Sequence, residues 1–257
     1  MAEKPLVYII LGAAGSGRRE IVADLVESGL TPDDRVAVML ADTEAPDAAD
    51  ARLPGLIRWE GSDGFILTPR PPGATHVFFV TDGRLNPVDQ LETLRTWLEA
   101  QGAEVARILA VVDCHLASQH PSLLAWFEAC VHFSDVVLLT RREGLPNKWL
   151  SEFRTYFDKQ FYPCLFENVK GGQVKNPALV LDPLARRLTH AFDAEQDWIF
   201  TDADGEVVEE DEATDGDEEV EAAPEEDPYF VRDAAQRRAK KIPDIRKFLP
   251  TPEAKPE

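Results

Sequence analysis

The stretch Pro5–Glu27, PLVYIILGAAGSGRREIVADLVE, decides the fold. Its first part, Leu6–Leu11, is an unbroken apolar run that includes Val, Tyr and Ile, and such a run is typical of a strand buried on both faces. A glycine-rich turn follows, and Arg18–Glu27 then carries apolar residues at helical spacing. A strand, a glycine turn and a helix in this order predict a phosphate-binding loop.

The turn contains Gly12, Gly15 and Gly17, separated only by small residues. Glycines let several backbone N–H groups converge on one point, because no Cβ blocks a close approach or a positive φ. That point lies at a helix N-terminus, where unpaired N–H groups and the helix dipole attract an anion. We therefore expect these three glycines and Ser16 to form a cradle for phosphate. The alternative is that the glycines form only a tight turn between strand and helix.

Two positions depart from the usual loop pattern G-x-x-x-x-G-K-[ST]. Arg18 stands where a Lys would reach the β- and γ-phosphates, and it keeps the positive charge. Its planar fork needs more room than an ammonium group. Arg19 stands where a Ser or Thr hydroxyl would bind Mg²⁺, which a guanidinium cannot do. The sequence therefore predicts that both arginines contact a nucleotide, that the usual loop hydroxyl does not hold Mg²⁺, and that hydrolysis is slow or lost.

Strand and helix patterns alternate along the rest of the chain. Further strands are expected at residues 35–41, 75–81, 105–113, 135–140, 161–166 and 178–182, and helices at residues 86–101, 118–131, 147–159 and 184–192. This alternation with short connections predicts an α/β fold with a mostly parallel, doubly wound sheet and helices on both faces, as in P-loop NTPases.

Polar residues follow several of the expected strands. In parallel sheets, ligands bind at the carboxyl ends of the strands. Those ends carry Gly12–Arg19, Asp42, Asp82, Gly83, Asp113 and the segment Thr140–Glu143. Turns also need Asp and Gly, which explains part of the pattern without a ligand. Asp113, Cys114 and His115 are adjacent, and because neighbouring strand residues face opposite sides, no metal site is expected there.

Composition divides the chain into three parts: a P-loop NTPase-like domain at 1–200, an acidic linker at 201–227 and a tail at 228–257. Residues 202–227 hold fifteen carboxylates and no Lys or Arg, and without them the net charge changes from −20 to −5. A segment of this composition is expected to be disordered.

The tail differs from the linker in charge. Pro228–Pro250 interleaves seven Lys and Arg residues with apolar residues, a pattern typical of a docking segment. It is expected to fold back on the acidic stretch, to dock on the domain, or to bind an external acidic surface. The favoured hypothesis is that the tail binds a protein partner, and binding of a nucleic acid is the weaker hypothesis.

The chain is expected to be cytoplasmic. The N-terminus lacks the features of a signal peptide, and no apolar run approaches the 18 residues that a membrane helix needs. Three separated cysteines suit a reducing compartment.

Four segments, in order, resemble the CobW-like metallochaperone GTPases. PLVYIILGAAGSGRREIVADLV resembles the first strand and loop of that family, HVFFVTDGRLNP its E-T-[ST]-G-x-A-x-P segment, RILAVVDC its V-V-D-A strand, and SDVVLLTRREGL its guanine-reading A-D-x-x-x-x-N-K-x-D-L. The resemblance implies that Asp82 and Gly83 lie where the γ-phosphate or a metal is sensed. It also implies that Thr140, Arg141 and Glu143 lie where the guanine base is read.

Departures from the family pattern affect its functional positions. Val80 replaces a glutamate, and Thr140, Arg141 and Glu143 replace the Asn, Lys and Asp of the base-reading segment. No cysteine occurs in Asp42–Thr81, so the C-x-C-C metal motif of the family is missing. Two hypotheses follow. The chain is a divergent CobW-like protein that binds GTP, or ATP, with weak or lost hydrolysis, or it is a pseudo-GTPase that serves as an interaction or assembly scaffold without nucleotide. No residue is assigned a catalytic role.

Overall fold

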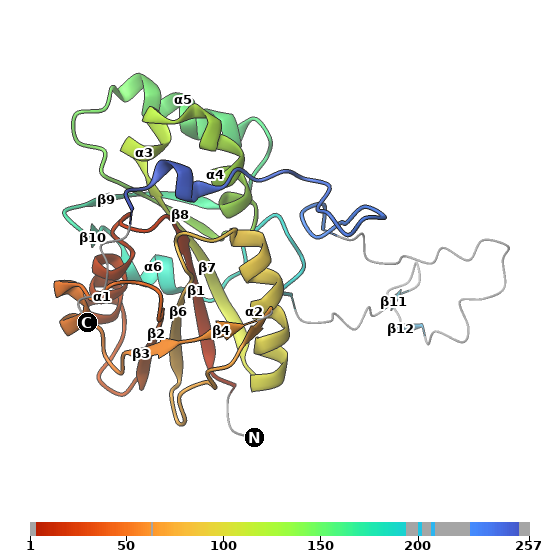
Figure 1. The fold of residues 1–257 in the computed structure, drawn as a ribbon. Helices are drawn as coiled ribbons and strands as arrows, with labels where there is room; N and C mark the ends of the chain where they lie inside the picture. Colours follow the sequence, from red (N-terminus) through yellow and green to blue (C-terminus); the bar gives the residue numbers. More distant parts are fainter. Residues whose placement is uncertain (1–3, 63, 194–199, 202–206, 209–226, 252–257) are drawn as a thin grey trace, which may run out of the picture.

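An eight-stranded sheet forms the centre of the molecule (Figure 1). The structure is a computed structural model that describes residues 4–62, 64–193, 200–201, 207–208 and 227–251. The strand order is β10-β9-β8-β7-β1-β6-β2-β3, and each pair is parallel except β9 with β10. The predicted mostly parallel, doubly wound sheet of a P-loop NTPase is therefore confirmed.

The strands of the main sheet are β1 (Leu6–Gly12), β2 (Val36–Ala41), β3 (Ile57–Trp59), β6 (His76–Val80), β7 (Glu104–Asp113), β8 (Val136–Thr140), β9 (Leu165–Lys170) and β10 (Gln173–Val174). Two short pairs stand outside it, β4 (Gly61–Ser62) with β5 (Phe65–Ile66) and β11 (Phe200–Thr201) with β12 (Val207–Val208). The helices are α1 (Arg18–Gly29), α2 (Pro87–Gln101), α3 (Cys114–Gln119), α4 (Leu124–His132), α5 (Asn147–Asp158) and α6 (Pro177–Leu181), with short 3₁₀ turns η1 (Ala48–Arg52), η2 (Pro121–Leu123) and η4 (Ile245–Phe248).

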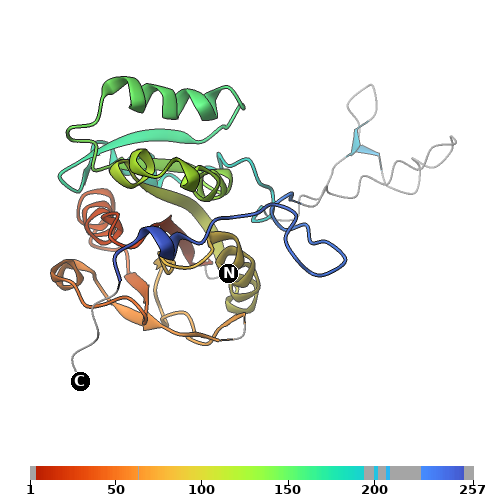
Figure 2. The same cartoon turned by 45° about the horizontal axis from the view of Figure 1, so that its top comes forward.

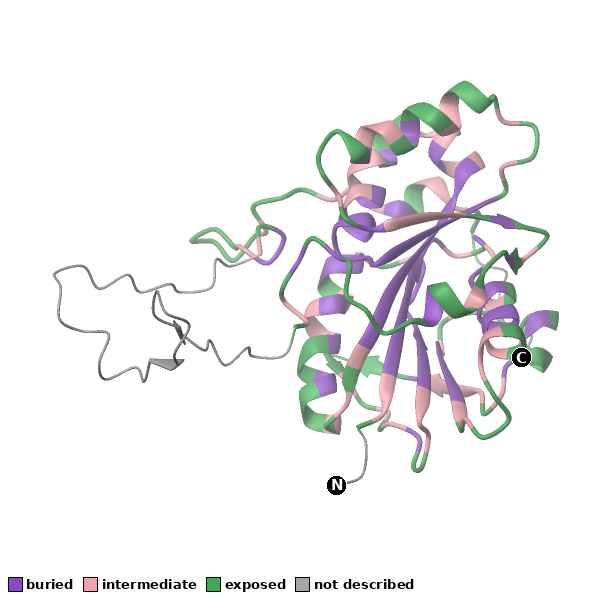
Figure 3. Ribbon diagram, turned by 180° about the vertical axis from the view of Figure 1, so that it is seen from behind, coloured by how far each residue is buried: buried purple, intermediate pink, exposed green. Residues whose placement is uncertain are grey.

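Helices cover both faces of the sheet, and β1 shows how its residues divide between them (Figures 1 and 2). Val7, Ile9 and Leu11 belong to a core with α2, α3, α4 and α5. Tyr8 and Ile10 belong to a second core with α1 and α6. The strands between the two helical layers are buried along almost their whole length (Figure 3). This burial explains why β1 is an unbroken apolar run instead of an alternating one.

The predicted strand at 178–182 is wrong, because Pro177–Leu181 is the helix α6. Pro177 is its first residue, a position where a missing N–H and a fixed φ favour a helix. The helix packs on α1 at Gly29, where an added Cβ would lie only 2.7 Å from Leu181 Cδ1.

The predicted helix at 184–192 is also wrong, and this segment has no helix. Two of its residues bind the buried carboxylate of Asp135. The Arg186 amide donates to it over 2.6 Å, and the Arg187 guanidinium lies 3.2 Å from it. These contacts hold the segment against the start of β8 in a non-helical path. The strand expected at 161–166 lies four residues later, as β9, and Phe161, with a positive φ of 58°, belongs to the turn that precedes it.

The described part of the tail, residues 228–251, packs on the domain. Tyr229 and Phe230 are buried with their rings 5.7 and 5.3 Å from that of Phe133, and Ile245 is 1% exposed. Docking on the domain was one of the three outcomes left open by the sequence. The predicted disordered linker falls almost entirely outside the described residues.

Within the described ranges, no helix combines the length and apolar character needed to span a bilayer.

Candidate functional site

The glycine loop connects β1 to α1 in the conformation that its sequence predicts. Gly15 and Gly17 have φ angles of 80° and 93°, in the region that glycine favours. At Gly12, with φ 141°, an added Cβ would lie 2.6 Å from the carbonyl oxygen of Val111. These glycines are therefore required by the backbone path, whether or not an anion is bound.

Arg18, the residue at the usual Lys position, is buried and is engaged by the protein itself. Its side chain is 3% exposed, and its guanidinium donates to the carbonyl oxygen of Thr81 and to the carboxylate of Glu44. Thr81 follows β6, the strand next to β1. The positive charge expected to meet a phosphate is thus paired with a carboxylate of the same chain.

Arg19 binds the same carboxylate from the next position. Its guanidinium lies 3.0 Å from Glu44 Oε2 and 2.9 Å from Asp50 Oδ1, and Arg58 lies 2.6 Å from the other oxygen of Asp50. We call these five residues, Arg18, Arg19, Glu44, Asp50 and Arg58, the ion-pair cluster. Burial opposes ionisation of Glu44, but Arg18 and Arg19 together hold the pKa of its carboxyl below the ordinary value. The cluster therefore contains two carboxylates beside the loop, and their negative charge offsets the attraction of the arginines for a phosphate.

Gly83 presses on the loop from the end of β6. Its carbonyl oxygen accepts from the Ala14 amide over 3.0 Å, and an added Cβ at Gly83 would lie only 2.2 Å from that nitrogen. One of the loop amides thus has an acceptor within the chain. Gly83, which the family resemblance places where the γ-phosphate or a metal is sensed, thus contacts the loop directly.

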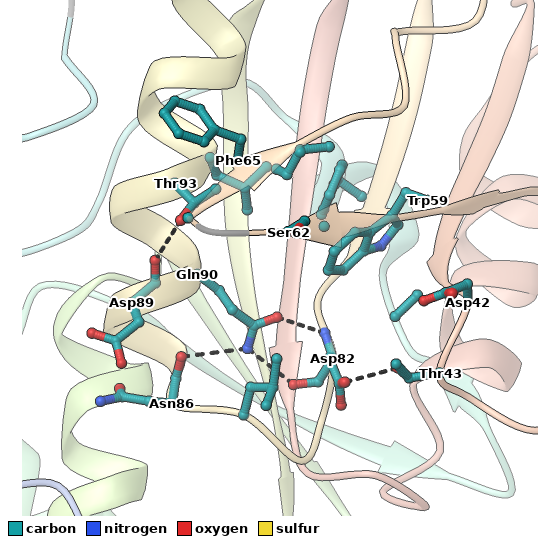
Figure 4. A pocket seen from close by; sticks show the side chains of 17 residues that line it. Asp42, Thr43, Trp59, Ser62, Phe65, Asp82, Asn86, Asp89, Gln90 and Thr93 are labelled. Carbon is teal, nitrogen blue, oxygen red and sulfur yellow. Dashed lines mark hydrogen bonds between the residues drawn. The ribbon is translucent and has the colours of Figure 1, made fainter.

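Asp82 faces away from this contact. Its carboxylate accepts from the Thr43 hydroxyl and from the Arg84 amide, each over 2.8 Å. It lines a cavity of about 290 Å³ enclosed by β3, the β4–β5 hairpin and the first turns of α2 (Figure 4). Asp42, at the end of β2, lines the same cavity.

The residues predicted to read a base lie at the end of β8. The Thr140 hydroxyl is buried and donates to the carbonyl oxygens of Ser16 and Val112, so it holds the loop in place. Arg141 has a positive φ of 50°, and its guanidinium lies 3.1 Å from Asp113. The Glu143 side chain is exposed, and its carbonyl oxygen lies 2.8 Å from His115 Nε2.

The described residues give little support for a metal site or for a reactive thiol. The described residues contain no group of three or more His, Cys, Asp and Glu side chains placed to hold a metal ion. Cys114 is fully buried, and burial raises the pKa of its thiol to about 12. It is therefore protonated at neutral pH and a poor nucleophile.

The tail crosses the sheet at the carboxyl ends of its central strands, near the glycine loop (Figure 2). The Arg84 side chain, after β6, donates to the Pro250 carbonyl over 2.8 Å. His120, after α3, has its ring 5.2 Å from that of Phe248. Because β1 lies between β6 and β7, the turn η4 spans the two connections that flank the loop. The sequence did not predict this placement, and it did not predict Glu44, which follows β2 in a segment with no periodic pattern.

Comparison of the sequence with protein-family profiles and with curated proteins found no match. Solved structures resemble the fold. The Zn(II)-bound YjiA GTPase from E. coli is 13% identical, with 72% of this chain and 67% of that chain covered and a TM-score of 0.41. The signal recognition particle receptor FtsY from Elizabethkingia anophelis, in complex with GDP, is 15% identical, with coverages of 76% and 66% and a TM-score of 0.46. The hydrogenase maturation factor HypB from Archaeoglobus fulgidus is 11% identical, with coverages of 64% and 81% and a TM-score of 0.42.

The parallel strands around β1 and the glycine loop that leads into α1 give the chain a P-loop NTPase-like fold. The site itself does not fit a Mg²⁺–nucleotide complex as it stands. Arg18 and Arg19 are paired with Glu44, and the Gly83 carbonyl accepts the hydrogen bond of a loop amide. Residue 19 has no hydroxyl to bind Mg²⁺.

Proposed function

We propose that the chain is a divergent, CobW-like P-loop protein that has lost nucleotide hydrolysis and acts as an interaction or assembly scaffold. The observation that carries this proposal is the pairing of Arg18 and Arg19 with the buried carboxylate of Glu44. An incoming triphosphate would have to displace that carboxylate and would meet its negative charge. Breaking such a buried pair is costly, since it leaves a charge without a partner.

The tail supports a scaffold function as well. Five of its seven cationic side chains already contact the protein: Arg232 and Arg238 bind Glu92, Arg237 binds Asp233, Arg246 binds Asp244, and Lys240 lies over the Tyr229 ring. Arg232 and Arg238 are held by Glu92 of the domain, so their charge is partly compensated before any nucleic acid backbone could bind, which favours a protein partner. We therefore propose that Pro228–Pro250, while packed on the domain, forms the surface that binds a protein partner.

Thermal unfolding of the full chain tests the proposal. Wild-type protein is measured alone and with GTP or ATP, each with and without Mg²⁺. A scaffold without a nucleotide site shows no stabilisation, and phosphate release stays at the buffer rate. A nucleotide at a hundred times its Kd adds ~2.7 kcal/mol to the free energy of unfolding. A saturable stabilisation that is lost in Arg18→Ala would overturn the proposal.

A second candidate is a GTP-binding protein that opens before it binds. Ser16 favours it, because its buried hydroxyl oxygen has no hydrogen-bond partner among the described residues, and the space around Gly15 is open. Such a protein would need Glu44 to leave Arg18. Glu44→Gln is then expected to acquire, or strengthen, stabilisation by GTP, whereas Glu27→Gln, which removes an exposed ion pair with Arg52, is not.

A further inference from the structure

The cavity of about 290 Å³ between β3, the β4–β5 hairpin and α2 is separate from the glycine loop (Figure 4). We call it the Trp59 pocket. The two sites adjoin at two segments. In Asp82-Gly83 the glycine contacts the loop and the aspartate side chain lines the pocket, and in residues 42–44 Asp42 and Thr43 line the pocket while Glu44 binds Arg18 and Arg19. Its volume lies at the lower end of the range for small-molecule sites. The pocket therefore suits a compact ligand and not a nucleotide.

One side of the pocket is aromatic and rigid. The Trp59 indole nitrogen donates to the Val80 carbonyl over 2.9 Å, and its ring lies 5.0 Å from that of Phe79. Phe65, on the β4–β5 hairpin, is 61% exposed, and Leu85 is 44% exposed, an uncommon exposure for large apolar side chains beside a cavity. The pocket thus offers an apolar surface that a ligand would cover.

Three polar side chains of the wall use their hydrogens within the wall. The Thr43 hydroxyl donates to Asp82, the Thr93 hydroxyl to the Asp89 carbonyl, and the Gln90 amide to the Asp82 and Asn86 carbonyls (Figure 4). The amide oxygens of the wall are engaged as well, because Gln90 Oε1 accepts from the Asp82 amide and Asn86 Oδ1 from the Val88 amide. The Asp82 carboxylate accepts from Thr43 and Arg84 and still has lone pairs left, so a ligand that brings hydrogen-bond donors fits this wall better than one that brings acceptors.

The charges of the wall have one sign. Asp42, Asp82 and Asp89 line the pocket, and none of the described lining residues is Lys, Arg or His. Asp89 also binds Arg238 of the tail, so part of its charge is compensated from outside. Carboxylates beside aromatic faces favour an organic cation, through charge-assisted hydrogen bonds and cation–π attraction. An anion would be repelled.

We propose that the Trp59 pocket binds a small organic amine, with the protonated nitrogen at the carboxylates and the apolar body against Trp59 and Phe65. A bare metal ion is a poorer fit, because the described residues place no three metal-binding side chains together. The proposal does not depend on whether the glycine loop binds a nucleotide.

Nuclear magnetic resonance of the full chain tests this assignment. The probe is 2-phenylethylamine, with 2-phenylethanol as its neutral match and 3-phenylpropionate as its anionic match. The indole N–H signal of Trp59, identified by its loss in Trp59→Phe, is followed during each titration. We expect a saturable shift with the amine, and binding of the alcohol and the acid that is weaker by about tenfold or more, since one charged hydrogen bond contributes about that factor.

Two variants locate the probe. Asp42→Asn removes one carboxylate and is expected to weaken amine binding several-fold. Phe65→Ala removes an exposed ring and is expected to weaken it without loss of stability, while Leu67→Ala, also 61% exposed but outside the pocket lining, leaves it unchanged. Equal binding of the amine and the alcohol, or no saturable shift with the amine, would overturn the proposal.

Discussion

The glycine loop and the Trp59 pocket lie on opposite sides of Asp82-Gly83, and their charges are arranged in opposite ways. At the loop, Arg18 and Arg19 are nearly buried and paired with Glu44. In the pocket, three aspartates line an open cavity without a lining cation among the described residues. A loop can thus have the backbone geometry of a phosphate-binding motif while its charged side chains are paired inside the protein. The open binding volume lies beside the motif, not in it.

The largest effect is expected from breaking the ion-pair cluster. Glu44→Gln leaves the buried Arg18 guanidinium without a charged partner, and we expect a loss of about 3–5 kcal/mol in the free energy of unfolding. Glu27→Gln, which breaks a half-exposed pair with Arg52, is the matched control and is expected to cost at most about 1 kcal/mol. Urea unfolding measures both. Equal losses in the two variants would contradict the structural importance of the cluster.

Tail docking should depend on one buried ring. Tyr229 is 3% exposed and packs on His132 and Phe133, so Tyr229→Ala is expected to weaken docking by about 3 kcal/mol. Hydrogen exchange of residues 229–249 reports the change as lost protection. Lys241→Ala, at an exposed position, serves as control and should leave protection as in the wild type. If exchange in the tail is already unprotected in the wild type, the docked tail is refuted.

How much the sequence predicts depends on how local each interaction is. The path from β1 through the glycine loop to α1 follows from contiguous residues, so apolar runs and glycines were sufficient. The segments 178–182 and 184–192 were assigned wrongly, because their conformations depend on contacts with α1 and with Asp135, more than forty positions away in the chain.

The state of the candidate site was not predictable for the same reason. Glu44 reaches Arg18 across 26 positions, and Pro250 reaches Arg84 across 166. The sequence offered one signal, two arginines at a helix N-terminus, whose repulsion by the dipole requires a nearby negative charge. This signal favours a bound phosphate or another acidic group, and in the structure the carboxylate of Glu44 lies there.

Acid should weaken the ion-pair cluster in a defined direction. The pKa of Glu44 is lower in the folded state than its ordinary value of 4.5, so the unfolded chain binds the proton more readily. The stabilisation is complete above about pH 4.5 and is lost as the pH falls through the lowered folded pKa. In acid, the free energy of unfolding of wild type should therefore fall more steeply than that of Glu44→Gln, by at most about 1.4 kcal/mol per pH unit. Parallel profiles would contradict this.

The smallest effect separates two arginines of the tail. Arg238 is 9% exposed at its side chain and binds Asp89 and Glu92, so Arg238→Ala is expected to weaken tail docking by about 1 kcal/mol. Arg237, 78% exposed and paired only with Asp233 in its own turn, should change docking by less than about 0.5 kcal/mol. The two variants are compared by the same exchange measurement. A larger loss for Arg237→Ala would show that Glu92 and Asp89 do not hold the tail.

The most direct measurement follows the backbone amide signals of Gly15 and Gly17 in the full chain while GTP and Mg²⁺ are added. These amides would meet a bound phosphate first. Because the cations of the loop are paired with Glu44, we predict that neither signal moves in wild-type protein at any GTP concentration within the usual range of nucleotide affinities. A saturable shift of both signals, abolished in Arg18→Ala, would contradict the claim that the glycine loop binds no nucleotide because Glu44 occupies its arginines.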